Sequence, residues 1–255
     1  MLVTAKALKG YKLHCTDGEI GTVTEFIFDD RDWTIRYLVI ETGTWLIDRQ
    51  VLISLQSLAG VDENAKFFSV NLTKHQIEDS PTLFKDVPVS REYEDQYHQY
   101  YRLPAYWNTT STWLPVPDMM GDSAAVKEAL EGDKNLEPDL HSTGNVSGRR
   151  VHATDGEIGH IVDFIIDDEA WAVRYLVVNI HNWLPGKKVL ISPTWIDHIF
   201  WDESPLAVNV LREKIKHSPE YSDTCELNRD YEKELHKHYD REGYWNDKAA
   251  EADKK

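Results

Sequence analysis

The chain has 255 residues, enough for one large domain or two small ones, and its 41% of hydrophobic residues can supply a packed core. Its formal net charge of −16 disfavours contact with nucleic-acid phosphates and anionic lipids, so we expect no nucleic-acid partner. Two cysteines, no apolar leader and no apolar run near the roughly 18 residues of a membrane helix predict a cytoplasmic protein without a transmembrane segment.

An internal repeat organises the chain. The hexapeptide at 16–21 recurs at 154–159, an offset of 138 residues, and the same offset relates 36–39 to 174–177. The match runs without a gap from Gly10 to Trp107. Because such self-similarity marks duplicated structural units, we read the two halves as copies of one domain.

The first copy begins with strand signals. A short strand is expected at 10–15, followed by a turn at 16–19, because Asp-Gly supplies the positive φ of a tight hairpin. The alternating segment 20–29 predicts a second strand with a bulge at Gly21. After a polar turn at 29–32, further strands are expected, at 33–42, 51–55 and 67–72. The matching strands of the second copy begin near Val151, Ile158, Trp171, Val189 and Leu206.

A helical tail follows each copy. One or two helical turns are expected at 73–78, ended by Pro81, and a helix follows with Ser90 as its N-cap. Four tyrosines fall on one face of this helix: Tyr93, Tyr97, Tyr100 and Tyr101. The second tail repeats the face with Tyr231, Leu235, His238 and Tyr239, and Asn228 is its N-cap candidate.

These elements predict an all-β fold with short helices, arranged as two tandem small barrels with aromatic helical tails. The expected boundaries are repeat 1 at 1–80, tail 1 at 81–107, a linker at 108–145, repeat 2 at 146–218, and tail 2 with a frayed end at 219–255. Within the linker a short helix is expected at 122–130, and the frayed end covers 247–255.

The repeat resembles the PRC-barrel family. The resemblance rests on Asp-Gly-Glu-Ile-Gly at 17–21, Phe-Ile-Phe-Asp-Asp at 26–30, Ile-Arg-Tyr-Leu-Val at 35–39 and Val-Leu-Ile-Ser at 51–54. It covers about 10–78 and 148–216. The family includes the cytoplasmic domain of the photosynthetic reaction-centre H subunit and, more distantly, the C-terminal domain of the ribosome-maturation factor RimM. The resemblance implies a small β-barrel that acts through contacts with other proteins; it does not imply photosynthesis.

Reactive sites are weakly supported by the sequence. The acidic turns, 17–19 with 29–30 and their counterparts, lack Ca²⁺-loop spacing and read as hairpin turns. His14, His98 and their counterparts lack a converging set of ligands. Cys15 has no partner cysteine or base. Arg36 and Arg174 lie inside apolar strands, and Asp29 or Asp30, with Asp167 or Asp168 in the second copy, is their expected partner. We therefore expect no catalytic residue, no cofactor and no metal.

The tail aromatics are the strongest lead, because aromatic side chains are enriched at interfaces. They could pack on their own repeat, on the other repeat or on another chain. The candidate interaction residues are Tyr97, Tyr100, Tyr101, Tyr106, Trp107, Tyr239, Tyr244 and Trp245. The leading hypothesis is a non-catalytic protein-interaction and assembly module, with unknown protein partners and a possible homodimer. The alternatives are a metal-dependent enzyme that uses the acidic turns and a sensor that holds a small ligand between the repeats.

Overall fold

The described part of the chain is rich in strands. The computed structural model describes residues 1–43, 45–46, 49–84, 88–108, 140–180, 186–198, 205–224 and 226–245. The segments expected as a helix at 122–130 and as a frayed end at 247–255 lie outside the described residues, as do Trp183 and Cys225. Strands joined and followed by short helices confirm the predicted strand-rich class.

The two halves contain corresponding elements at the offset of 138 residues. The strands of the first half are β1 (Leu2–Thr4), β2 (Lys12–Cys15), β3 (Gly18–Asp29), β4 (Thr34–Glu41), β5 (Arg49–Ser54), β6 (Leu58–Asp62), β7 (Phe67–Val70) and β8 (Leu83–Phe84). Its helices are α1 (Ala5–Leu8), η1 (Leu55–Ser57), α2 (Lys74–Glu78), α3 (Arg91–Tyr101) and η2 (Tyr106–Asn108).

The second half repeats most of this series. Its strands are β9 (Leu140–Ser142), β10 (Arg150–Ala153), β11 (Gly156–Asp167), β12 (Ala172–Asn179), β13 (Lys188–Ile191), β14 (Ile196–His198) and β15 (Leu206–Val208). Its helices are α5 (Thr143–Val146), η3 (Pro193–Trp195), α6 (Arg212–Lys216) and α7 (Arg229–His238). β9 and the first three residues of α5 therefore lie within the stretch expected as linker, at 108–145. β9 pairs with β3, and Thr143 of α5 is buried.

Local sequence explains the long hairpin of each half. Gly18, the first residue of β3, adopts a φ of +130° directly after the turn that follows β2. The Asp17 carboxylate in this turn accepts a hydrogen bond from Lys74 N at 2.9 Å, which ties the turn to α2. The bulge expected at Gly21 appears as a register shift just after its partner Leu13. A Cβ on Gly21 would stand 2.1 Å from Glu41 O, so glycine permits the close approach to β4.

One mixed sheet runs through both halves. The strand order is β14-β15-β10-β11-β12-β4-β3-β2-β7-β6, and its two ends do not meet. The halves join where Ile35 N donates to Trp171 O and Val173 N donates to Trp33 O, each at 2.7 Å. The structure therefore confirms a strand-rich fold but not two separate closed barrels, because pairing of β4 with β12 makes the sheet continuous.

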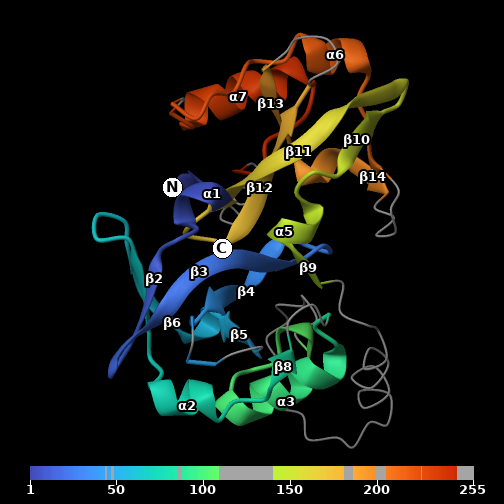
Figure 1. The fold of residues 1–255 in the computed structure, drawn as a ribbon. Helices are drawn as coiled ribbons and strands as arrows, with labels where there is room; N and C mark the ends of the chain where they lie inside the picture. The colour runs from blue at the N-terminus through green and yellow to red at the C-terminus, as the bar shows by residue number, and fades with distance from the viewer. Residues whose placement is uncertain are drawn as a thin grey trace, which may run out of the picture.

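The hydrophobic core also crosses the boundary between the halves. Phe28 and Phe164, both almost fully buried, come from β3 and β11 and place their ring centroids 6.0 Å apart. A second cluster lies under α3 and includes Tyr37, Tyr93 and Tyr97. In Figure 1 the helices α2 and α3 cover one end of the molecule, whereas α6 and α7 cover the other. Each tail helix thus lies over its own half.

Candidate functional site

The most concentrated chemistry of the described residues lies under the two tail helices. Tail cluster 1 consists of Tyr37, Arg91, Glu94, His98 and Tyr106. Tyr37 comes from the middle of β4, and Tyr106 comes from η2. The other three lie on one face of α3, because residues spaced by three and four share a helix face. Ser90 begins this helix as expected, since its hydroxyl accepts a hydrogen bond from Tyr93 N at 3.2 Å.

The carboxyl group of Glu94 is the centre of tail cluster 1. Its Oε1 atom lies 2.8 Å from the Tyr37 hydroxyl and 2.7 Å from the Tyr106 hydroxyl. Its Oε2 atom lies 2.7 Å from Arg91 Nη1. The Tyr37 hydroxyl also lies 3.0 Å from His98 Nε2. Glu94 is fully buried, so these contacts replace the water that a carboxyl group would otherwise bind.

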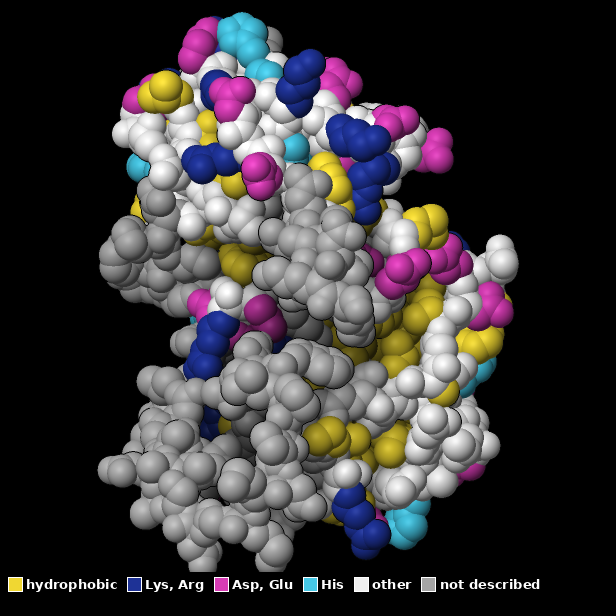
Figure 2. Space-filling view, turned by 180° about the vertical axis from the view of Figure 1, so that it is seen from behind, with side chains coloured by type: hydrophobic (Ala, Val, Ile, Leu, Met, Phe, Trp, Pro, Cys, Tyr) yellow, Lys and Arg dark blue, Asp and Glu magenta, His cyan; other side chains and the backbone are white. Residues whose placement is uncertain are grey.

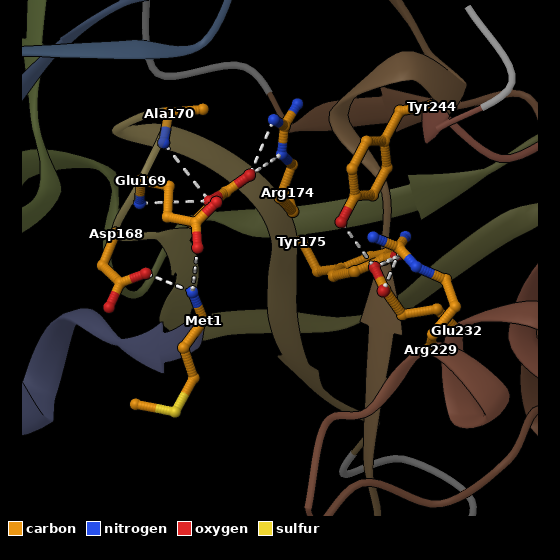
Figure 3. Close-up of polar contacts among 10 residues, drawn as sticks. Met1, Asp168, Glu169, Ala170, Arg174, Tyr175, Arg229, Glu232 and Tyr244 are labelled. Atoms are coloured by element: carbon orange, nitrogen blue, oxygen red, sulfur yellow. Dashed lines mark hydrogen bonds and ion pairs between the residues drawn. The ribbon is translucent and has the colours of Figure 1, made fainter. Parts of the chain in front are cut away.

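Tail cluster 2 reproduces this arrangement in the second half. Its members are Tyr175, Arg229, Glu232, His236 and Tyr244. Glu232 Oε1 lies 2.9 Å from the Tyr175 hydroxyl and 2.8 Å from the Tyr244 hydroxyl. Arg229 Nη1 lies 2.9 Å from Glu232 Oε2. Figure 3 shows Tyr175, Arg229 and Tyr244 converging on the Glu232 carboxyl. A chemistry that used either cluster would therefore be available twice.

Counting donors shows how many protons tail cluster 1 holds. His98 Nδ1 lies 3.1 Å from Pro104 O, and a carbonyl only accepts, so Nδ1 carries a proton. The single hydroxyl proton of Tyr37 cannot serve both Glu94 and His98 Nε2. All contacts are satisfied only when one further proton lies on Glu94 or on the imidazole. Burial raises the pKa of Glu94 and lowers the pKa of His98, which favours the proton on Glu94.

Two arginines extend the clusters to the acidic turns. Arg36 Nη2 lies 3.3 Å from Asp29 Oδ2 and 2.8 Å from Asp32 Oδ2, and its guanidinium lies 4.0 Å from the ring centroid of Tyr106. The predicted pairing of Arg36 with Asp29 is confirmed. Arg174 pairs in the same way with Asp167, at 2.8 Å. Its guanidinium carbon lies 4.1 Å from the ring centroid of Tyr244, beside which Figure 3 draws it. The acidic turns therefore fix the arginines on which the tail tyrosines stack.

The eight candidate interaction aromatics lie close to these clusters. Tyr97 and Tyr239 are buried, and Tyr101, Tyr106, Trp107, Tyr244 and Trp245 are half-buried. Trp107 and Trp245 stack over Arg91 and Arg229, 4.3 and 4.4 Å from the guanidinium carbons. Only Tyr100 of the eight is exposed, at 39%. Tyr100 nevertheless donates a hydrogen bond to Gln76 O at 2.9 Å, so all eight have neighbours within the chain. Contact with another protein stays a prediction.

Cys15 and His14, two further side chains with reactive groups, lie in ordinary structural environments. Cys15 is buried, and burial raises its pKa to about 11, so its thiol is protonated at neutral pH. His14 lies 3.7 Å from Glu19 on the surface. Within the part of the chain that the structure describes, no group of three or more His, Cys, Asp or Glu is placed to hold a metal ion.

Two clefts lie between the halves at corresponding positions. The larger, about 360 Å³, is lined by residues 30–33 of the first half and by Arg174, Ser192, Thr194 and Tyr244 of the second. The smaller, about 260 Å³, is lined by Ala170 and Trp171 of the second half and by Arg36, Ser54, Gln56 and Tyr106 of the first. Each cleft therefore combines a turn of one half with the arginine and tail tyrosine of the other.

Sequence reasoning does not single out Arg91, Glu94 or their counterparts. The signal is present in the repeat, because Arg91, Glu94 and His98 recur as Arg229, Glu232 and His236. Polar residues retained in both copies of a duplicated helix mark a buried polar contact as readily as an exposed face. The structure shows His98 buried and hydrogen-bonded rather than in solvent.

Comparison with known proteins identifies one domain. The PRC-barrel domain family matches residues 5–77, so the first half contains a PRC-barrel domain. This agrees with the resemblance over 10–78; the resemblance over 148–216 has no such match. No curated protein matches the chain. Among the helices of the described residues, none combines the length and apolar character needed to cross a membrane.

Proposed function

We propose that the chain is a non-catalytic protein-interaction and assembly module built from two PRC-barrel repeats, similar in kind to the cytoplasmic domain of the reaction-centre H subunit. The PRC-barrel domain at residues 5–77 is compatible with this role. A catalytic module would need a reactive group that is open to a substrate. The proposal therefore depends on whether the ionisable groups that occur at equivalent positions of both halves serve structural contacts or a reaction.

One observation carries the proposal: these shared groups hold segments of the chain together. Asp17 and Asp155 accept hydrogen bonds from Lys74 N and Arg212 N at the start of α2 and α6, at 2.9 and 2.8 Å. Asp29 and Asp167 fix the two arginines beneath the tails. Glu94 and Glu232, with exposed fractions of 0% and 2%, fasten the tail helices. The ionisable groups that recur in the two halves therefore hold segments of the chain together, which supports a structural role over a catalytic one.

Affinity capture from the source cells tests this function. We expect a small set of proteins to bind the full chain and to rebind when purified. Because a net charge of −16 attracts basic proteins non-specifically, the control bait is an unrelated protein of equal charge, and binding is measured at two salt concentrations. Two results together would reject the proposed interaction function: no protein binds the chain in preference to the control bait, and the chain turns over a substrate.

The twin clefts favour one second candidate, a sensor that holds a small ligand between the repeats. Each cleft is lined by both halves, so an occupant would bind both at once. A thermal-shift screen of metabolites tests it, because a ligand that binds only the folded state raises the Tm. The matched control is Thr194→Trp, which fills the larger cleft and should abolish the shift. A shift that this variant leaves unchanged would place the ligand elsewhere.

A further inference from the structure

Each half of the chain sends its N-terminal arm to the other half. The first arm is β1 with α1, and the second arm is β9 with α5. β1 pairs antiparallel with β11, with Val3 opposite Ile166, whereas β9 pairs with β3, with His141 opposite Phe28. In Figure 1 the blue segment of β1 and α1 lies among the yellow strands of the second half. The arms are therefore exchanged.

Side chains and backbone fix both arms on their receiving strands. Ala5 and Leu8 of the first arm and Val146 of the second are almost fully buried. Lys6 N donates to the Asp163 carboxylate at 3.2 Å, and Phe26 N donates to the Thr143 hydroxyl at 3.2 Å. Each arm thus combines strand pairing with burial of an apolar helix face, as in recognition by strand addition.

The exchange has the geometry of a two-fold dimer within one chain. Leu2 pairs with Asp167 as Leu140 pairs with Asp29, so the two contacts match at the offset of 138 residues. The central contact between the strands β4 and β12 is also reciprocal. In a two-fold interface each partner offers the same surface to the other. Each half consequently has one arm to donate and one strand edge that receives an arm.

The arm contacts described above are all made by residues outside the connection between the halves. Residues 109–139 join η2 to β9, and every contact of the arms described above lies outside that segment. The second half of any copy offers the first half the same arm and the same receiving strand edge, whether it belongs to the same chain or to another copy. For these contacts, pairing within one chain differs from pairing between two copies by the effective concentration of the tethered partner, which reaches roughly millimolar values.

We propose that a second copy of this chain is a partner of the arms, so that the first half of one copy and the second half of another exchange arms and form a dimer with the contacts seen here. The inference rests on the proposed interaction function and names a partner for it. The dimer satisfies both arms of both copies, and its population rises with protein concentration because the competing reaction is closure within one chain.

Disulfide trapping in the full-length chain tests the exchange. In a background of Cys15→Ala and Cys225→Ser, one chain carries Val3→Cys and a second carries Ile166→Cys; alanine already occupies the equivalent of Cys15, at position 153. Efficient formation of the covalent heterodimer, above the level of random collision, requires that the arm of one copy lie on β11 of the other. After the two chains are refolded together and oxidised, we expect cross-linked dimer to rise roughly tenfold between about 10 µM and 1 mM protein.

Two controls make the result decisive. The chain with Ile166→Cys is also mixed with a chain carrying Val61→Cys, an exposed position on β6, which measures random collision. A chain carrying both Val3→Cys and Ile166→Cys must close internally, which shows that the pair can form. Cross-linking no greater than with Val61→Cys overturns the proposal, and so does failure of the double variant to close. Neither result affects capture of other proteins, which tests the proposed function separately.

Discussion

The position of a single proton determines which hydrogen bonds can form within each tail cluster. Tyr37 and Tyr175 each present one hydroxyl to a carboxyl oxygen and to a histidine nitrogen, at 2.8 to 3.0 Å. In water such a mismatch would be solvated, but Glu94 and His98 are buried. An unsatisfied buried group costs about 1–3 kcal/mol, so the protonation state of Glu94 bears directly on the docking of α3.

Replacement of Glu94 separates the effect of its charge from the effect of its hydrogen bonds. Glutamine has the shape of a protonated glutamic acid, and in both groups one terminal atom can donate a hydrogen bond while the other only accepts. Glu94→Gln should therefore change the free energy of unfolding by less than about 1 kcal/mol. Glu94→Ala leaves Tyr37, Tyr106 and Arg91 without an acceptor and should cost about 2–4 kcal/mol. Urea unfolding at pH 7 measures both. Equal losses for the two variants would contradict a protonated Glu94.

The two tail histidines predict a loss of stability in acid. Burial lowers the pKa of His98 and of His236 below the ordinary value of 6.5, so the unfolded chain takes up protons first as the pH falls. Their contribution to stability is therefore complete above about pH 6.5 and is lost as the pH falls through the lowered values. Between about pH 7.5 and 5 the two histidines lower the free energy of unfolding, whereas Glu94, whose pKa burial raises, acts in the opposite direction. The prediction therefore concerns a difference: on acidification, the variant with His98→Gln and His236→Gln should lose less stability than the wild-type chain.

The control for this profile is His75→Gln, because His75 is 80% exposed and lies outside both clusters. This variant should keep the slope of the wild-type chain. The comparison uses slopes rather than absolute stabilities, so a general loss from the double substitution does not affect it. An unchanged slope in the double variant would show that groups other than these two histidines set the pH dependence of unfolding.

Sequence reasoning locates the tails better than the contacts inside them. The tyrosine periodicity and the caps Ser90 and Asn228 predict both helices correctly. The pattern cannot reveal Glu94, because α3 buries two neighbouring faces: the tyrosine face against the sheet and a polar face against Tyr37 and η2. A carboxyl group on a helix is usually in solvent, and only its partner from a distant strand changes that.

At the scale of elements, glycine controls how closely two strands approach. Gly21→Ala should destabilise the chain by about 1–3 kcal/mol, because the added Cβ would stand 2.1 Å from the backbone oxygen of Glu41, which cannot rotate away. Gly60→Ala is the matched control, since a Cβ added there would have no atom within 4 Å. Thermal unfolding compares the two; a harmless Gly21→Ala would mean that β3 and β4 separate easily.

The arms are the elements that the sequence conceals. The match between the copies begins at Gly10, after the first arm, and Leu2-Val3-Thr4 shares only its leucine with Leu140-His141-Ser142. Three-residue strands have too few positions to show alternation. Their stability comes from pairing with β11 and β3, which lie in the other half of the chain. Such non-local pairing leaves no local signal, which explains why the expected linker extends to residue 145.

At the scale of the whole molecule, the halves share one core. Buried residues from both halves form a single hydrophobic cluster. Backbone hydrogen bonds from Ile35 to Trp171 and from Val173 to Trp33 also join the two halves. Hydrophobic side chains appear between the two lobes on the face seen in Figure 2. A separated half would expose this core and one strand edge, which is unfavourable for a β-rich domain. Because the two halves share this core, we expect them to unfold as one cooperative unit.

A core substitution in the second half should consequently loosen the first. Phe164→Ala removes a buried ring that faces Phe28, and it should cost about 3–5 kcal/mol of global stability. Hydrogen exchange should then accelerate for amides of β3 as much as for those of β11, in a single unfolding transition. Leu211→Ala, at a position 57% exposed, should change stability by no more than about 0.5 kcal/mol. If the amides of β3 keep their wild-type protection from hydrogen exchange while those of β11 lose it, the halves unfold independently. The exchanged arms would then link two separately folded domains instead of forming part of a single folded unit.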